Sequence, residues 1–265
     1  MYDGLAGFYD KYTGDMNHEK VAEFLIRCFK KYGNKGLKAV AAGKTADGVT
    51  DGTDIESSNL VIDVGCGTGK LSIILAKRGF DVTGLDISPE MLYEAQQNAE
   101  AENVNIMWLC QDMTKMNTYG SYAAMVCTYD GINHVTTINR LREFFKRAYN
   151  FVDPGGLLIF DYLTKEYFEN YIDGNVMVDD QGDGTCIWQG KYNEKNEICT
   201  YSVTCYSETE DGTYSRSDDV IKEKAWQTET LKTELQSAGF AIKEIFAGKR
   251  IFIVAKKPIG DEKNG

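Results

Sequence analysis

The stretch Val-Ile-Asp-Val-Gly-Cys-Gly-Thr-Gly-Lys at 61–70 combines three glycines with an acid, a set of residues that can hold a small charged ligand. Gly65, Gly67 and Gly69 allow a sharp turn and let a ligand approach the backbone without meeting a Cβ atom. The stretch lies between an expected strand and an expected helix, so the free N–H groups of a helix N-terminus face the same place. An anionic or carboxylate group fits those N–H groups, whereas Asp63 opposes a phosphate and can receive an ammonium group.

The spacing of these glycines separates the loop from two common nucleotide-binding motifs. The dinucleotide fingerprint requires G-x-G-x-x-G, and position 70 here is Lys, while Gly69-Lys70 is followed by Leu71 and not by the Ser or Thr of a P-loop. Asp86 ends the next expected strand, 21 residues after Gly65, where a carboxylate can accept hydrogen bonds from both hydroxyls of a ribose. The alternative is that Asp86 is only an exposed residue ahead of the helix start at Ser88. Its pairing with the glycine loop favours the ribose interpretation.

Alternating strands and helices predict the fold that positions these residues. Apolar, β-branched runs predict strands, and apolar residues at a spacing of three and four predict helices. The expected strands are 60–64, 80–86, 105–110, 122–127, 157–162, 240–247 and 250–257, and the expected helices include 17–32 and 136–151. This order predicts a doubly wound, mostly parallel, seven-stranded α/β sheet of Rossmann-like architecture.

An antiparallel β-meander is expected as an insertion in this α/β domain. It consists of three runs rich in β-branched and aromatic residues, 185–192, 197–208 and 214–226. Trp188 and Tyr201, within these runs, are interpreted as core or interface aromatics. The full division is an N-terminal helical lid (1–32), a flexible glycine-rich linker (33–58), a core (59–175 and 226–257), the meander (176–225) and a polar tail (258–265).

Four motifs in order resemble those of the class I S-adenosylmethionine-dependent methyltransferases. They are the glycine loop with Asp63, the acid Asp86, Gln111-Asp112-Met113 after the third strand, and Asp153-Pro154-Gly155-Gly156 before the fifth. The resemblance covers about 59–257 and the N-terminal Phe-Tyr-Asp-Lys-Tyr. It is closest to the small-molecule branch with a meander after the fifth strand, which includes deoxyaminosugar N-methyltransferases.

This resemblance implies S-adenosyl-L-methionine as the cofactor and assigns residues to its parts. The methionine part would be held by Asp63 and the 65–69 loop, the ribose by Asp86, and the adenine by the residues around the next two strand ends. The complete expected cofactor set is Tyr9, Asp63, Gly65, Cys66, Gly67, Gly69, Asp86, Ile87, Met91, Asp112, Met113 and Tyr129.

The segment Cys-Thr-Tyr-Asp-Gly-Ile-Asn-His-Val at 127–135 follows the fourth strand, where the ligand crevice of such a sheet lies. Methyl transfer from a sulfonium needs mainly positioning, and a base only if the acceptor arrives protonated. His134 and Asp130 are the candidate bases, and the ring of Tyr9 could favour the sulfonium charge. The alternatives are a half-buried His134 that satisfies a helix start, and lid packing for Tyr9. Asp161, at the end of the fifth strand, is expected to cap a turn.

The composition of the chain argues against nucleic acid and membranes as binding partners. The 265 residues carry 40 acidic and 29 basic side chains, a formal charge of −11, which disfavours a broad nucleic-acid-binding face. No apolar run reaches the ~18 residues of a membrane span, and the first residues lack a signal-peptide pattern, so a cytoplasmic location is expected.

The cysteine pattern argues against a disulfide framework and a metal centre. Seven cysteines form no C-x-x-C pair, and only two histidines are present. We therefore expect buried, reduced thiols and no metal site. The exposed edges of the meander offer a route to a homodimer.

The sequence thus favours a methyltransferase acting on a small molecule. A tRNA-base methyltransferase and a non-catalytic nucleoside-ligand binding protein stay open as alternatives. A nicotinamide oxidoreductase is disfavoured by the glycine spacing.

Overall fold

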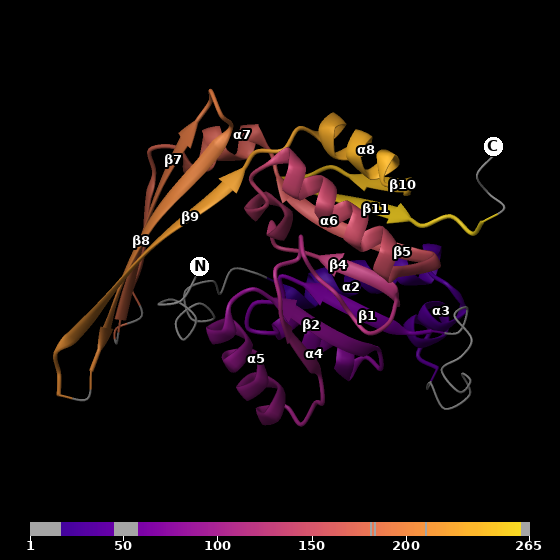
Figure 1. Ribbon diagram of the computed structural model, residues 1–265. Coiled ribbons are helices and arrows are strands. Elements are labelled where there is room, and N and C mark those ends of the chain that lie inside the picture. The colour runs from indigo at the N-terminus through magenta and orange to yellow at the C-terminus, as the bar shows by residue number, and fades with distance from the viewer. Residues whose placement is uncertain (1–16, 45–57, 181, 183, 210, 261–265) are drawn as a thin grey trace.

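The main body is a seven-stranded sheet in the order β10-β11-β5-β4-β1-β2-β3 (Figure 1). The computed structural model describes residues 17–44, 58–180, 182, 184–209 and 211–260. Strands β1 to β5 run parallel, and β11 lies antiparallel between β5 and β10. The strands are β1 (Leu60–Val64), β2 (Asp81–Asp86), β3 (Met107–Cys110), β4 (Tyr122–Cys127), β5 (Val152–Leu163), β10 (Ala241–Phe246) and β11 (Arg250–Lys256). The expected mostly parallel, Rossmann-like sheet is confirmed.

Helices cover both faces of this sheet. One face carries α6 and α8, and the other carries the helices from α2 to α5 (Figure 1). The helices are α2 (His18–Tyr32), α3 (Lys35–Ala41), α4 (Lys70–Lys77), α5 (Pro89–Ala101), the 3-10 helix η3 (Gly131–His134), α6 (Ile138–Phe151) and α8 (Thr228–Ser237). Within the described ranges, no helix combines the length and the apolar character that crossing a membrane requires.

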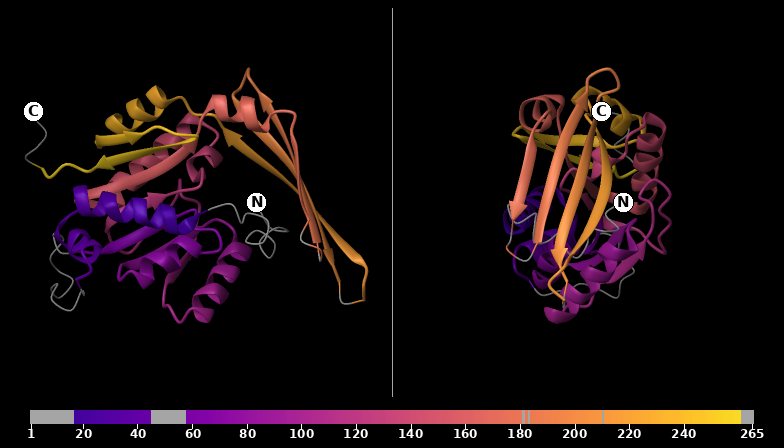
Figure 2. Two further views of the ribbon diagram at one scale, coloured as in Figure 1. Left: turned by 180° about the vertical axis from the view of Figure 1, so that it is seen from behind. Right: turned by 90° about the vertical axis from the view of Figure 1, so that its left-hand side faces the viewer.

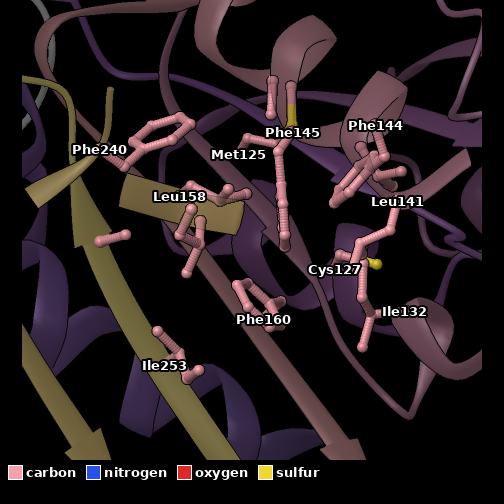
Figure 3. Packing of buried hydrophobic residues seen from close by; sticks show 14 of the residues in the cluster. Met125, Cys127, Ile132, Leu141, Phe144, Phe145, Leu158, Phe160, Phe240 and Ile253 are labelled. Carbon is pink, nitrogen blue, oxygen red and sulfur yellow. The ribbon is translucent and has the colours of Figure 1, made fainter. Parts of the chain in front are cut away.

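The core on the α6 face shows why the central strands read as continuous apolar runs. Side chains of β4 and β5 alternate between the two faces, as parallel strands covered on both sides require. Figure 3 shows those that belong to the α6 face. Met125 and Phe160 point toward α6, where Phe144 and Phe145 are fully buried. This packing fixes the carboxyl ends of the strands, where the candidate site lies.

The N-terminal region differs from the expected lid and linker. Helix α2 packs into the core through fully buried Leu25 and Phe29. The described part of the expected lid therefore belongs to the helical layer on one face of the sheet. Residues 35–41 of the expected linker form α3, because Leu37 and Val40 bury against α2. Residues 1–16 and 45–57, including Tyr9, lie outside the described part of the chain.

A second, antiparallel sheet forms the insertion. Its order is β6-β7-β8-β9, and the β8–β9 hairpin projects well beyond the main sheet (Figure 2). The strands are β6 (Val176–Asp180), β7 (Gly184–Asn193), β8 (Ile198–Glu208) and β9 (Tyr214–Lys224), preceded by α7 (Lys165–Tyr167) and the π-helical turn η4 (Phe168–Ile172). The sequence predicts only three of these strands, since β6 is short and ends in two aspartates. Trp188 and Tyr201 pack ring to ring, as expected for core aromatics.

The cysteines of the second sheet correct one expectation. Cys186 and Cys205 lie directly opposite each other on β7 and β8 and form a disulfide, with a Cα–Cα distance of 4.2 Å. Strand register brings them together over a sequence separation of 19, and composition alone contains no register information. The other five cysteines are free thiols.

Trp108 of β3 packs against two glycines, Gly69 and Gly84. A Cβ atom on Gly84 would lie 2.2 Å from the Trp108 ring, and one on Gly69 would lie 2.6 Å from it. Gly69 therefore serves the packing of Trp108 and the left-handed start of α4.

We predict that Gly84→Ala lowers the free energy of unfolding by about 1–3 kcal/mol, because the added methyl group overpacks the Trp108 contact. Urea denaturation measures this change. Gly120→Ala is the matched control, since nothing lies within 4 Å of a Cβ there. Equal stability of the two variants would show that Trp108 does not require Gly84.

Candidate active site

A pocket opens at the carboxyl ends of β1, β2 and β4 and brings together most of the predicted site residues. Its wall also includes His18, Gln111, Thr128 and Arg140, which the sequence analysis did not assign. The predicted residues on its wall are Asp63, Gly65, Cys66, Gly67, Asp86, Ile87, Met91, Asp112, Met113, Tyr129 and His134. Gly69 and Asp130 are not on the wall, and Tyr9 lies outside the described residues.

The glycine loop is held in place by the end of β2. Gly65 and Gly67 have φ values of 71° and 54°, a region that glycine adopts without strain. The backbone N–H of Gly67 donates to Asp86 Oδ2 at 2.9 Å, and that of Ser88 donates to Asp86 Oδ1 at 3.0 Å. The Leu85 carbonyl accepts from the Gly65 N–H at 2.7 Å. Asp86 therefore joins the loop after β1 to the start of α5.

Asp63 is a buried acid on the pocket wall. Its side chain is 2% exposed, and Oδ2 accepts a 2.7 Å hydrogen bond from the Ser72 hydroxyl. Burial raises the pKa of Asp63 to about 6, and the nearby Asp86 adds to this rise. A cationic group in the pocket would stabilise the ionised form of this carboxyl.

Asp112 is another acid on the pocket wall, and it is bonded to Thr114 and Arg140. Its Oδ1 accepts from the Thr114 N–H at 2.9 Å and from the Thr114 hydroxyl at 2.8 Å, and Oδ2 accepts from Arg140 at 2.9 Å. Burial raises the pKa of Asp112, but these bonds outweigh it and the net pKa is lowered. Arg140 lies near the start of α6, and nothing in its local sequence indicates this distant partner.

The turn after β4 is fixed by Asp161. The backbone N–H groups of Tyr129 and Asp130 donate to the Asp161 carboxylate at 3.1 and 2.7 Å. Both donors have a φ of 57°, an uncommon conformation for residues other than glycine. Arg250 of β11 pairs with Asp130 and Asp161. Asp161 thus caps a turn, as expected, but the turn follows β4 and not its own strand.

His134 lies at the pocket wall on η3. Its side chain is 17% exposed, and Nε2 lies 3.9 Å from Oε1 of Glu223 on β9. Burial lowers the pKa of His134, which keeps the imidazole neutral near pH 7. The pKa of the Cys66 thiol is raised well above its usual value, mainly by burial, so this cysteine remains an uncharged wall residue.

The fold is Rossmann-like, with a pocket at the carboxyl edge of a parallel sheet. In such folds a nucleoside-containing ligand binds between a glycine loop after the first strand and an acid at the end of the second. Residues 61–156 match the family model described as "Methyltransferase domain". The chain therefore contains a methyltransferase domain, which confirms the expected enzyme class, and its fold is shared with a solved S-adenosylmethionine-dependent methyltransferase.

Similar proteins span nearly the whole chain. A Geobacillus sp. (strain WCH70) protein, whose name provisionally assigns it as a methyltransferase, is 28% identical over 266 residues, covering 97% of this chain and 99% of that protein. A Clostridium acetobutylicum ATCC 824 S-adenosylmethionine-dependent methyltransferase has a TM-score of 0.77 at 20% identity, covering 97% and 99% of the two chains. The sugar N-methyltransferase KedS8 from Streptoalloteichus sp ATCC 53650 has a TM-score of 0.71 at 15% identity, covering 95% and 92%. The two solved structures show that the fold extends over the second sheet.

We predict that Asp86→Ala weakens binding of S-adenosylhomocysteine by at least ~1 kcal/mol, because it removes a charged acceptor for the ribose and for the Gly67 N–H. Isothermal titration calorimetry measures the dissociation constant. Asp81→Ala, at the exposed start of the same strand, is the control and should bind as the unmodified chain does. An unchanged constant for Asp86→Ala would show that Asp86 does not hold the ribose.

We also predict that this affinity falls as the pH drops below about 6, where Asp63 becomes protonated. The ionised carboxyl attracts the ammonium of the ligand and the protonated one does not, so affinity should be level from pH 7 to 8. In Asp63→Asn the affinity should be lower and should no longer depend on this ionisation. His18→Gln and His134→Gln control for the two histidines of the wall. An equal pH dependence in Asp63→Asn would contradict the assignment.

Proposed function

We propose that this methyltransferase moves the methyl group of S-adenosylmethionine to a small-molecule acceptor by in-line displacement. The observation that carries the proposal is that one pocket contains the glycine loop and Asp86 at one end and the 128–134 turn at the other. A cofactor in the first part would direct its reactive group toward the second. Such proximity supplies most of the rate acceleration that this chemistry needs.

The wall residues match the parts of the cofactor. Asp63 offers a buried carboxyl for the ammonium, and the N–H groups of the glycine loop suit the carboxylate. Asp86 would accept hydrogen bonds from the ribose hydroxyls. The adenine would lie between apolar side chains, with Asp112 for its amino group. The apolar side chains of this part of the wall are Ile87, Met91 and Met113.

The acceptor end of the pocket contains Tyr129 and His134. The cofactor supplies a methyl group that is already activated, so this chain needs only to orient the acceptor and exclude water. The buried Tyr129 hydroxyl has no hydrogen-bond partner among the described residues and can bond to an acceptor. Of the two candidate bases, neutral His134 lies on the wall, whereas Asp130 is paired with Arg250 away from it. We assign proton acceptance, where an acceptor requires it, to His134.

Two features support an acceptor of small size. The formal charge of −11 opposes the binding of a polynucleotide. The 128–134 turn, here called the acceptor turn, is packed against the second sheet through Asn133, whose side-chain amide donates to the Lys224 carbonyl at 2.8 Å. A tRNA base would need an open basic approach to this turn.

The proposal predicts tight binding of S-adenosylmethionine and S-adenosylhomocysteine, and little binding of NAD, in calorimetry. Incubation with methyl-labelled cofactor should then label metabolites below about 1 kDa from a cell extract, a cut-off chosen to exclude tRNA. Tight binding of NAD without a response to either sulfur ligand would overturn the cofactor assignment. Label in the tRNA fraction alone would overturn the small-molecule acceptor.

A further inference from the structure

Three potential metal ligands meet where the second sheet touches the acceptor turn. One ligand atom each from Asp130, His134 and Glu223 lies within 4.8 Å of the other two. The three residues come from the turn after β4, from η3 and from β9. Their side chains are 14%, 17% and 6% exposed, so the cluster lies beneath the surface.

The charges of this cluster do not balance. Asp130, Asp161 and Glu223 contribute three carboxyl groups, and Arg250 pairs with the first two. One carboxylate oxygen of Glu223 lies within 4.8 Å of one of Asp130, and Glu223 Oε2 is buried without a hydrogen-bond partner among the described residues. Two ionised carboxylates this close repel each other unless a proton or a cation lies between them. A divalent ion would neutralise three carboxylates beside one guanidinium, whereas a buried unpaired carboxylate is costly.

We propose that Asp130, His134 and Glu223 bind one divalent transition-metal ion. A neutral imidazole nitrogen with two carboxylate oxygens suits zinc, manganese, iron or cobalt better than magnesium or calcium. The 3.9 Å between His134 Nε2 and Glu223 Oε1 is shorter than roughly 4.2 Å, twice a metal–ligand bond, so these two atoms can share an ion. Asp130 supplies the third ligand atom, within 4.8 Å of the other two.

The fold holds the ligand-bearing elements together independently of any ion. The Asn133 side-chain amide donates to the carbonyls of Leu163 and Lys224 at 2.9 and 2.8 Å. The indole N–H of Trp226 donates to the Val135 carbonyl at 3.0 Å. These bonds fix β9 beside η3, so that Glu223 and His134 stay together.

The site would lie at the acceptor end of the pocket, since His134 is on the pocket wall. Three protein ligands leave coordination positions for water or for an oxygen or nitrogen of an acceptor. With the ion bound, Nε2 of His134 is a ligand, so the proton acceptance assigned to His134 above applies to the chain without the ion. The cofactor-binding half of the pocket does not depend on this ion.

The test uses the full chain labelled with ¹⁵N at its two histidines, which gives few and assignable imidazole signals. Zn²⁺ added to one equivalent should shift the His134 signal, and the His18→Gln variant assigns it. Calorimetry with Zn²⁺ should show one site, with affinity at least tenfold weaker in Glu223→Gln. Glu208→Gln, at the exposed far end of β8, is the control and should match the unmodified chain.

Co²⁺ binding distinguishes an ion held at this site from an ion held by cysteine thiolates. The ion should give only weak visible bands, without the intense near-ultraviolet absorption of thiolate ligands. The proposal would be overturned by the absence of saturable binding, by thiolate absorption alone, or by equal affinity in Glu223→Gln. Each of these results would indicate that Asp130 and Glu223 share a proton and not a metal ion. Unchanged S-adenosylhomocysteine affinity in Glu223→Gln shows that such a failure leaves the proposed function intact.

Discussion

The two hydrogen bonds to the Asp86 carboxylate are the interaction on which the candidate site depends. One oxygen holds the N–H of Gly67 and the other holds the N–H of Ser88, so a single side chain sets the glycine loop against the start of α5. The glycines have no side chains with which to fix their own conformation. Their positive φ values are therefore maintained by what they bond to. A wall built in this way is already shaped before a ligand arrives.

The acceptor half of the pocket is also held by a buried carboxylate, that of Asp161. Asp161, fully buried at the end of β5, holds the backbone of the turn after β4 in an uncommon conformation. Arg250 from the antiparallel strand β11 balances part of its charge. The inserted sheet then closes over the turn and brings Glu223 to His134. Each half of the pocket is thus fixed by a carboxylate from a neighbouring strand.

The sequence predicted the parts of this fold that depend on local pattern. Helix α2 forms within the expected range 17–32 and buries Leu25, Cys28 and Phe29, because helical periodicity can be recognised in a single stretch of sequence. Helix α3 was missed because its small and polar residues resemble a linker until Leu37 and Val40 meet α2.

What the sequence could not predict depends on long-range partners. The Cys186–Cys205 pairing follows from strand register, and the Arg140 contact with Asp112 joins residues 28 apart. The surplus of carboxyl groups around Arg250 joins positions 130, 161, 223 and 250, and no local pattern links these four positions. The predicted site residues that meet at the pocket do so because their motifs lie at the ends of neighbouring strands of one sheet.

A crystal structure of the chain grown with S-adenosylhomocysteine tests the central claim most directly. The account predicts that the ribose hydroxyls lie within hydrogen-bonding distance of Asp86, that the ammonium group lies beside Asp63, and that the sulfur faces the 128–134 turn. Electron density for the ligand at another surface, or with its sulfur directed away from Tyr129 and His134, would contradict the account.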